Sequence, residues 1–311
     1  MSDPVVDALV AAGVGDVQGG APLAPLTTLR VGGAARALVT VERDADLAAV
    51  GAVAVEHGLP WLVVGRGSNL LVGDDGWPGV AIVLGRGFRG VTFTPSPVLP
   101  DGQRVRAGAA EPLPALAARV GDAGCSGFAW ACAVPGTLGG AVRMNAGAHG
   151  SDMAAHLAEV DLVRLRTGVR ETWTIDAVGL SYRRSQLPDD GIVVSATLDL
   201  QPGEAEQVRA EMHEIRAWRR AHQPLNQPNC GSVFTNPPGD SAGRLIDAAG
   251  CKGLTIGGAS VSERHANFIV TRRGATAADV LAVIEEVQRR VREHAGIALT
   301  TEVVRVATAS T

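Results

Sequence analysis

The first residue that could do chemistry is a serine between a glycine and a strand-like pair of residues. Ser232 stands in the segment N-C-G-S-V-F-T-N-P, residues 229–237, which an Asn-Pro turn signal closes. A serine hydrolase would need a histidine, an acid and a G-x-S-x-G turn, and this segment does not fit that pattern. A turn serine that caps local backbone is the plain alternative, because serine beside glycine is common in turns. The segment by itself leaves the role of Ser232 open.

Two glycine-rich segments are the second candidate for chemistry. G-R-G-S-N-L, residues 65–70, follows the apolar run W-L-V-V, and P-G-T-L-G-G-A occupies residues 135–141. Glycine admits positive φ and has no Cβ, so successive backbone N–H groups can converge on an anion. One such segment can equally be an ordinary turn, whereas two favour a bound pyrophosphate. Neither matches the Rossmann or P-loop patterns, so we expect a dinucleotide cofactor held in another way.

Composition and charge exclude several classes of protein. The 311 residues are 46% hydrophobic and 19% charged, an ordinary globular balance that allows two or three lobes. The net charge of −4 and the scattered arginines argue against a nucleic-acid partner. The sequence has no signal-peptide pattern and no uninterrupted apolar run that approaches a length of about 18 residues, so we expect no membrane span. The four cysteines form no C-x-x-C pair, which favours reduced thiols in the cytoplasm and no metal site.

Hydrophobic periodicity predicts a mixture of helices and strands. Helices are expected at residues 44–58, 113–123, 204–222 and 277–295, and strands at 61–64 (buried), 80–84, 91–93, 103–107, 158–165 and 191–200. In the helix at 204–222, one apolar face is expected to carry Val208, Met212, Ile215 and Trp218.

The end of the chain is expected to form a capped helix and a closing strand. For the helix at 277–295, Thr276 is the expected N-cap and Gly296 the C-terminal stop. An alternating strand at 297–306 would place Glu302 on one side with Thr300, Val304 and Val306. A carboxylate on such a face is costly unless it is paired or functional, although an edge-strand glutamate facing water is the alternative.

Several motifs, taken in chain order, resemble the UDP-N-acetylenolpyruvoylglucosamine reductase (MurB) family. They are T-L-R-V-G-G-A-A (28–35), V-V-G-R-G-S-N-L-L (63–71), V-P-G-T-L-G-G-A…M-N-A-G-A-H-G (134–150), S-Y-R-R-S (181–185), N-C-G-S-V-F-T-N-P (229–237), S-E-R-H-A-N-F-I-V (262–270) and T-T-E-V-V-R-V (300–306). The chain is similar to the shorter subtype, because Ser185 and Leu200 leave no room between them for the loop that carries a substrate-covering tyrosine in longer members. Tyr182 is the only tyrosine.

The resemblance implies an α+β fold. It would consist of a two-part FAD-binding domain of the vanillyl-alcohol-oxidase-like (PCMH) type and a C-terminal α/β substrate-binding lobe. The expected limits are an N-terminal segment at 1–19, the FAD-binding domain at 20–202, with subdomains at about 20–86 and 87–202, and the substrate-binding domain at 203–311.

The resemblance also implies a UDP-N-acetylmuramate dehydrogenase of peptidoglycan precursor synthesis. NADPH would reduce a non-covalently bound FAD, and the flavin would reduce the enolpyruvyl ether of the UDP-sugar substrate. We expect a monomer. One alternative is a flavin-dependent oxidase of the same superfamily, which often carries a covalent flavin on a residue such as His149 and would explain only the first lobe. Another is a non-catalytic flavin- or UDP-sugar-binding paralogue, against which the retention of Ser232, Arg183 and Glu302 argues.

By the same resemblance, Ser232 donates a proton to the substrate α-carbon, and the preceding Gly231 permits the close approach that this transfer needs. Glu302 and Arg183 would stabilise the enolate, and only the Y-R-x-S register favours Arg183 over Arg184. Residues expected to contact FAD are Gly65, Arg66, Gly67, Ser68, Asn69, Leu70, Pro135, Gly136, Thr137, Gly139, Gly140, Ala141, Asn145 and Gly147. Residues expected to contact the substrate are Tyr182, Asn236, Arg219, Arg220 and His222. The last three are candidates for the diphosphate, or else only a solvated helix end favoured by the helix dipole.

Overall fold

The structure, a computed structural model, describes residues 3–306. The chain divides into two compact units, each built from segments that are far apart in the sequence. The larger unit consists of Met1–Gly19, Ala37–Gly65 and Gly79–Trp218, and the smaller unit of Gly20–Arg36, Arg66–Pro78 and Arg219–Thr311. The functional domain limits expected from the sequence stay a prediction, since the compact units divide the chain differently.

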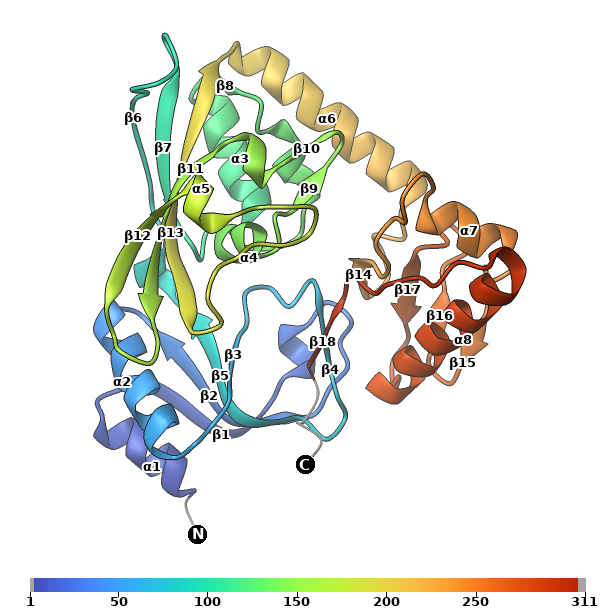
Figure 1. Ribbon diagram of the computed structural model, residues 1–311, viewed down its shortest axis with the longest axis horizontal. Helices are drawn as coiled ribbons and strands as arrows, with labels where there is room; N and C mark the ends of the chain where they lie inside the picture. The colour runs from blue at the N-terminus through green and yellow to red at the C-terminus, as the bar shows by residue number, and fades with distance from the viewer. Residues whose placement is uncertain (1–2, 307–311) are drawn as a thin grey trace. The chain divides into compact units, whose positions relative to one another are not determined.

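The larger unit is built on an antiparallel sheet with strand order β12-β11-β13-β7-β6, to which β8 adds at β13. The strands are β6 (Val91–Pro95), β7 (Gln103–Gly108), β8 (Cys125–Ser126), β11 (Leu157–Arg164), β12 (Arg170–Thr174) and β13 (Gly191–Pro202). Helices α3 (Leu113–Asp122) and α4 (Leu138–Arg143) lie beside this sheet (Figure 1). Leu116, Phe128, Leu138 and Leu198 are buried in the core that these elements share. The strands and the helix expected in this part of the chain are confirmed, with ends shifted by a few residues.

The rest of the larger unit packs around α2 (Asp44–Glu56). This helix shares a core with α1 (Pro4–Ala11) and with a four-stranded sheet of order β1-β2-β5-β3. Those strands are β1 (Asp16–Pro22), β2 (Ala34–Val41), β3 (Trp61–Val63) and β5 (Trp77–Leu84). The helix predicted at 44–58 is confirmed, and Gly58 follows it with a φ of +61°. The strand predicted at 61–64 is present, but its three residues in β3 are only half-buried rather than buried.

Short elements connect the helices and strands of the larger unit, and one further short element, η1, belongs to the smaller unit. They are η1 (Ala24–Leu26), η2 (Arg86–Phe88), η3 (Ala129–Ala133), β9 (Gly147–Ala148), β10 (Ser151–Asp152), η4 (Met153–Ala155) and α5 (Ile175–Val178).

The smaller unit contains an antiparallel sheet of order β14-β17-β16-β15 and a parallel pair, β18 and β4. The strands are β4 (Leu70–Val72), β14 (Asn229–Ser232), β15 (Thr255–Ile256), β16 (Ala259–Val261), β17 (Phe268–Thr271) and β18 (Val304–Val306). Helices α7 (Ala242–Ala248) and α8 (Ala277–Ala295) complete this unit (Figure 1). Leu29, Val31 and Leu71 from the first quarter of the chain are buried in the same core as these helices. That packing explains why two early segments belong to the smaller unit.

Two long helices can be compared with their predicted ends and apolar faces. In α8 the Thr276 side chain accepts from the backbone of Asp279, and Gly296 ends the helix with a φ of +70°. Both predicted ends of this helix are therefore confirmed. In α6 (Ala205–His222), Val208, Met212 and Ile215 are buried as predicted, but Trp218 is 46% exposed. The predicted apolar face is wrong at Trp218.

The predicted closing strand at 297–306 is also wrong, because only β18 and an isolated bridge between Thr301 and Phe234 form there. The backbone changes partners along this segment. Glu302 N donates to Val233 O at 2.7 Å, whereas Val304 N donates to Asn69 O at 2.9 Å. The predicted alternation is lost as a result, since Val304 is 39% exposed whereas Val306, expected on the same side, is buried.

Candidate active site

Ser232 lies at a bulge where β14 ends. Asn229 pairs with Val270 and Ser232 with Phe268, so β14 carries one extra residue between the two pairs. Gly231 has a φ of +75°, and its N–H donates to Asn229 Oδ1 at 3.0 Å. A Cβ on Gly231 would meet nothing within 4 Å. Its positive φ favours glycine, and the expected role of Gly231 in permitting close approach stays a prediction.

Glu302 lies next to the serine segment in the smaller unit. Its N–H donates to Val233 O at 2.7 Å, and its carbonyl accepts from Asn69 Nδ2 at 3.1 Å. Burial raises the pKa of the Cys230 thiol to about 12, and the charge of Glu302 acts in the same direction. The carboxylate is thus close enough to Cys230 to influence it. The structure thus pairs the backbone of Glu302 with Val233, the residue that follows Ser232.

Arg183 lies in the larger unit, at the tip of a two-residue turn. Ser181 and Arg184 close this turn with reciprocal backbone hydrogen bonds of 3.0 Å. Arg183 has a φ of +58°, a strained value for a residue other than glycine. Its Nη1 and Nη2 donate to the carbonyls of Asn145 and Gly147 at 3.3 and 3.0 Å. Arg183 is half-buried and Arg184 exposed, which agrees with the register that favoured Arg183.

Asn145, expected to contact the cofactor, uses its side chain inside the larger unit. It is only 2% exposed, and its Nδ2 donates to Ser181 O at 3.0 Å and to Asp152 Oδ2 at 3.1 Å. Its Oδ1 accepts from Ala154 N at 3.0 Å. Its backbone is bonded as well, since Asn145 N donates to Val142 O at 3.2 Å and its carbonyl accepts from Arg183. The side chain instead holds the turn that carries Arg183, a role that sequence reasoning missed.

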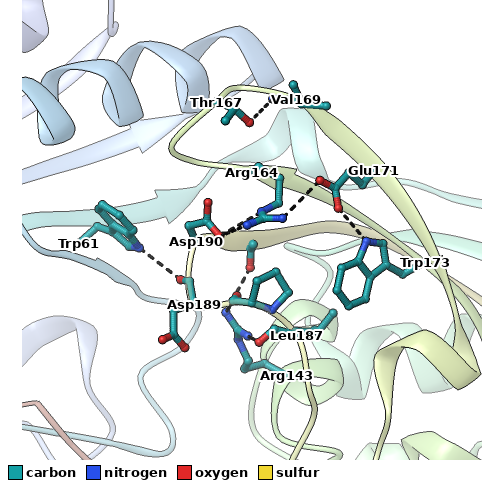
Figure 2. Close-up of polar contacts among 12 residues, drawn as sticks. Trp61, Arg143, Arg164, Thr167, Val169, Glu171, Trp173, Leu187, Asp189 and Asp190 are labelled. Carbon is teal, nitrogen blue, oxygen red and sulfur yellow. Dashed lines mark hydrogen bonds and ion pairs between the residues drawn. The ribbon is translucent and has the colours of Figure 1, made fainter.

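The segment after this turn is held by Arg143 of α4 (Figure 2). Arg143 Nη1 donates to Leu187 O at 2.8 Å, and Nη2 donates to the carbonyls of Pro188 and Gly191 at 2.9 and 3.2 Å. Burial lowers the pKa of Arg143, and the charge of Asp189 partly opposes this. The chain therefore passes from the Arg183 turn to β13 through a short, firmly bonded segment.

The two glycine-rich segments pack closely against their surroundings. In the larger unit, a Cβ on Gly65 would lie 2.7 Å from Thr137 Oγ1. Thr137 is the N-cap of α4, and its Oγ1 accepts from Gly140 N at 3.5 Å. In the smaller unit, Gly67 has a φ of +56°, and a Cβ there would lie 2.1 Å from Leu26 O. Larger side chains are excluded at both glycines.

The residues expected to contact substrate are placed in different ways. Tyr182 is exposed, and its ring centroid lies 5.2 Å from the guanidinium carbon of Arg183. Asn236 Oδ1 accepts from Ala242 N at 3.0 Å, at the start of α7. Arg219, Arg220 and His222 occupy the last turn of α6, so the alternative of a dipole-stabilised helix end stays open.

Basic side chains from other segments gather near the end of α6, which sequence reasoning missed. Arg264 Nη1 donates to Arg220 O at 3.0 Å. Burial lowers the pKa of His265, and the positive charges of Lys252 and His222 lower it further. The motif S-E-R-H-A-N, at 262–267, was the signal that could have pointed to Arg264 and His265.

Residues 3–306 contain no group of three or more histidine, cysteine, aspartate or glutamate side chains arranged as metal ligands. None of the helices within that range is long and apolar enough to cross a membrane. The four cysteines are free and buried.

Two family models match separate parts of the chain. A model described as "FAD binding domain" matches residues 35–172, and one described as "UDP-N-acetylenolpyruvoylglucosamine reductase, C-terminal domain" matches residues 223–306. These matches agree with the expected α+β fold class. The UDP-N-acetylenolpyruvoylglucosamine reductase of Methylorubrum populi is 46% identical over 285 residues, which cover 91% of this chain and 89% of that protein.

Further relatives extend the likeness across most of the chain. The reductase of Bacillus velezensis is 41% identical over 292 residues, covering 93% of this chain and 94% of that protein. The crystal structure of UDP-N-acetylenolpyruvylglucosamine reductase (MurB) from Thermus caldophilus superposes with a TM-score of 0.78 at 36% identity, covering 94% of this chain and 98% of that one. On this agreement in sequence and in fold, the chain belongs to the UDP-N-acetylenolpyruvoylglucosamine reductase family.

Proposed function

We propose that the protein reduces the enolpyruvyl ether of UDP-N-acetylglucosamine-enolpyruvate to UDP-N-acetylmuramate, a step in the synthesis of peptidoglycan precursors. FAD is the cofactor and NADPH the reductant. Relatives named for this reductase activity align with 91% of the chain or more. The observation that carries the proposal is the hydrogen bond from Glu302 N to Val233 O, which places Glu302 against the residue that follows Ser232. A proton donor must lie beside the group that stabilises the charge.

The residues present fit a non-covalently bound FAD. Gly65 is exposed, and its lack of a Cβ lets its backbone lie against Thr137. The hydroxyls of Thr137 and Ser68 are donors suited to a pyrophosphate. When bound, FAD supplies the means of carrying hydride from NADPH to the substrate. We propose that the two glycine-rich segments, Gly65–Leu70 and Pro135–Ala141, hold it, with support from Asn145 and Gly147.

Ser232 is proposed as the proton donor. Hydride addition to the methylene carbon breaks the carbon–carbon π bond and moves its electron pair onto the α-carbon and the adjoining carboxylate. The Ser232 hydroxyl then gives its proton to the α-carbon, and the resulting alkoxide takes a proton from water. A serine hydroxyl is a weak acid, so this step depends on a fixed position and on stabilisation of the alkoxide.

Arg183 and Glu302 are proposed to stabilise the enolate. The guanidinium of Arg183 offers several N–H donors in a planar fork that suits carboxylate oxygens. Glu302 can stabilise an enolate only as the acid, with its proton as the hydrogen-bond donor. Because Arg183 belongs to the larger unit and Glu302 to the smaller one, the role of Arg183 is proposed from its motif and its turn alone.

The substrate contacts remain proposals as well. Asn236 would use its Nδ2, because its Oδ1 is bonded at the start of α7. Tyr182 is exposed and available, and Arg219, Arg220 and His222 are proposed for the diphosphate. We also propose a monomeric, cytoplasmic protein that binds neither nucleic acid nor membranes. The four free thiols are those of a reducing compartment.

An anaerobic experiment in two steps tests the function. The flavin of the purified protein is reduced with NADPH, and the enolpyruvyl UDP-sugar is then added while absorbance is followed. We expect bleaching in the first step and full recovery of the oxidised spectrum in the second. A flavin that stays reduced with this substrate, yet reoxidises with oxygen, would favour an oxidase. Yellow colour that coprecipitates with the denatured protein would contradict non-covalent binding.

A further inference from the structure

The backbone that follows Ser232 is buried on both sides. Val233 and Phe234 are almost fully buried, so their peptide groups have no access to water. Buried backbone groups must find partners inside the protein, because leaving them unpaired is costly. On one side these partners come from the Glu302 segment, where Val233 O accepts from Glu302 N at 2.7 Å.

On the other side every partner comes from Asn267. Its backbone carbonyl accepts from Val233 N at 2.9 Å. Its side chain makes two further bonds to the next residue: Oδ1 accepts from Phe234 N at 2.9 Å, and Nδ2 donates to Phe234 O at 2.8 Å. Asn267 is itself only 4% exposed. The side-chain amide thus replaces a strand partner at the point where the β14–β17 ladder ends.

An amide side chain is required at this position. Phe234 presents one donor and one acceptor, and only an amide offers a matching acceptor and donor in one plane. An aspartate of the same size would keep the bond to Phe234 N but would set a carboxylate oxygen against Phe234 O. A leucine would satisfy neither group.

We infer that Asn267 is a positioning residue for the proton transfer: it holds the Val233–Phe234 segment so that Ser232 and Glu302 keep their mutual placement. Asn267 bonds to the backbone of Val233 and Phe234, so it would act through that backbone. The inference rests on the proposed roles of Ser232 and Glu302.

The variant Asn267→Asp tests this in the flavin-loaded protein. We expect reduction by NADPH to stay within twofold of wild type, while reoxidation by the enolpyruvyl UDP-sugar slows by on the order of 10²-fold, the scale of a small misplacement of reacting groups. In the Ser232→Ala background the same change should slow reoxidation by less than about threefold, because residues that act through one another are not additive. Fully multiplied losses in the double variant would overturn the inference.

The matched control is Thr271→Val, at the end of β17, the strand that follows Asn267. Thr271 is also buried, and its Oγ1 donates to Leu29 O at 2.7 Å, so this change also removes one buried side-chain bond to backbone. It should lower the unfolding midpoint comparably and leave reoxidation within twofold. Equal slowing by Thr271→Val and Asn267→Asp would mean that Asn267 matters for stability alone.

A second measurement separates this inference from the proposed function. In protein without flavin, amide hydrogen exchange at Phe234 should be faster in Asn267→Asp than in wild type by at least tenfold, and unchanged in Thr271→Val. If Asn267→Asp speeds exchange at Phe234 but the wild-type protein never reduces the enolpyruvyl UDP-sugar, the proposed function fails. The structural role of Asn267 in holding the Val233–Phe234 segment then stands. If exchange at Phe234 is unchanged, Asn267 does not hold this segment and the inference is wrong. Should Asn267→Asp not fold, Asn267→Ser, which keeps one donor and acceptor, takes its place with the same outcomes.

Discussion

At Ser232 a hydroxyl of ordinary acidity stands one residue away from the peptide that binds Glu302. Nothing in the serine itself makes it a proton donor, since a free hydroxyl gives up its proton only far above neutral pH. Its reactivity in the proposed reaction comes from position: a bulge aims the residue and Glu302 lies against the following peptide. Removing the Ser232 hydroxyl should therefore slow only the step that needs its proton.

Ser232→Ala should leave reduction of the flavin by NADPH nearly unchanged, because that step protonates no substrate carbon. Reoxidation by the UDP-sugar should slow by at least about 10²-fold, the usual cost of removing a positioned acid. Glu302→Gln and Arg183→Lys should slow the same step through weaker enolate stabilisation. Rapid-mixing absorbance of the flavin separates the two steps.

Ser232→Cys should retain part of the activity, since a thiol can still donate a proton. If Ser232→Ala slows reduction by NADPH and spares reoxidation, the serine belongs to the nicotinamide site and another group is the acid.

At the scale of elements, the bulge in β14 depends on one glycine. Gly231→Ala meets no neighbouring atom, so its cost is that of holding a Cβ residue in the left-handed region, about 1–2 kcal/mol. Because the strain lies next to Ser232, reoxidation should also slow.

Gly58→Ala is the matched control, since Gly58 also has positive φ and open space but follows α2. It should be destabilised to a similar degree with both half-reactions intact. Denaturant unfolding and rapid mixing check both variants, and equal effects on reoxidation would refute the argument.

The large sheet is held by a charged cluster around Asp161 of β11. The carboxylate accepts from Thr172 Oγ1 at 2.6 Å, Ser195 Oγ at 2.8 Å and Arg170 Nη2 at 3.0 Å, and it also pairs with Arg106. Burial by itself would raise the pKa of Asp161, but these hydrogen bonds outweigh it and hold the pKa well below its usual range.

Asp161→Asn should therefore lower the free energy of unfolding by about 2 kcal/mol at pH 7. This loss is smaller than that for breaking a fully buried ion pair, because both arginines are partly exposed. A carboxylate whose pKa is lowered on folding stabilises the protein above the unfolded pKa of about 3.9. The advantage of wild type should persist from pH 7 to about pH 5 and shrink as the pH falls below about 4. Denaturant unfolding across this range measures it.

Asp122→Asn, which removes an exposed pair with Arg209, serves as the control and should change stability little at any pH. A wild-type advantage over Asp161→Asn that grows on acidification would contradict the assignment.

At the scale of the whole molecule, the smaller unit cannot be cut from the chain at residue 202. Its core includes Leu29, Val31 and Leu71, and its β18 pairs with β4. Asp74 also accepts from the N–H groups of Ala277 and Ala278 at the start of α8, at 2.7 and 2.9 Å. These contacts lie within the smaller unit but come from the first quarter of the sequence.

A fragment of residues 203–311 should therefore not unfold cooperatively. Losing three buried side chains costs roughly 5 kcal/mol at about 1.5–3 kcal/mol each, comparable with the whole stability of a small domain. Thermal melting followed by circular dichroism checks this, with the full chain as the control. A sharp two-state transition in the fragment would show that the early segments are dispensable.

How much was readable in the sequence depended on how local the signal was. The helix at 277–295 was predictable to the residue, because Thr276 and Gly296 act on the backbone within one turn of themselves. The glycine-rich segments and the family motifs were equally readable, since each is a continuous run with its own chemistry. The closing strand was not, because residues 300–306 take hydrogen bonds from two different segments and lose the alternation of a strand.

The sequence by itself determined the family, the main helices and strands, and the residues worth testing. Tertiary structure alone decided how those residues are held. Gly231 adopts a positive φ at the bulge, Asn145 holds the turn of Arg183, and Asn267 holds the segment after Ser232. The physical reason is that each of these roles is a hydrogen bond or a backbone angle set by partners up to tens of residues away. Residue type and spacing carry no record of which buried peptide group a side-chain amide will meet.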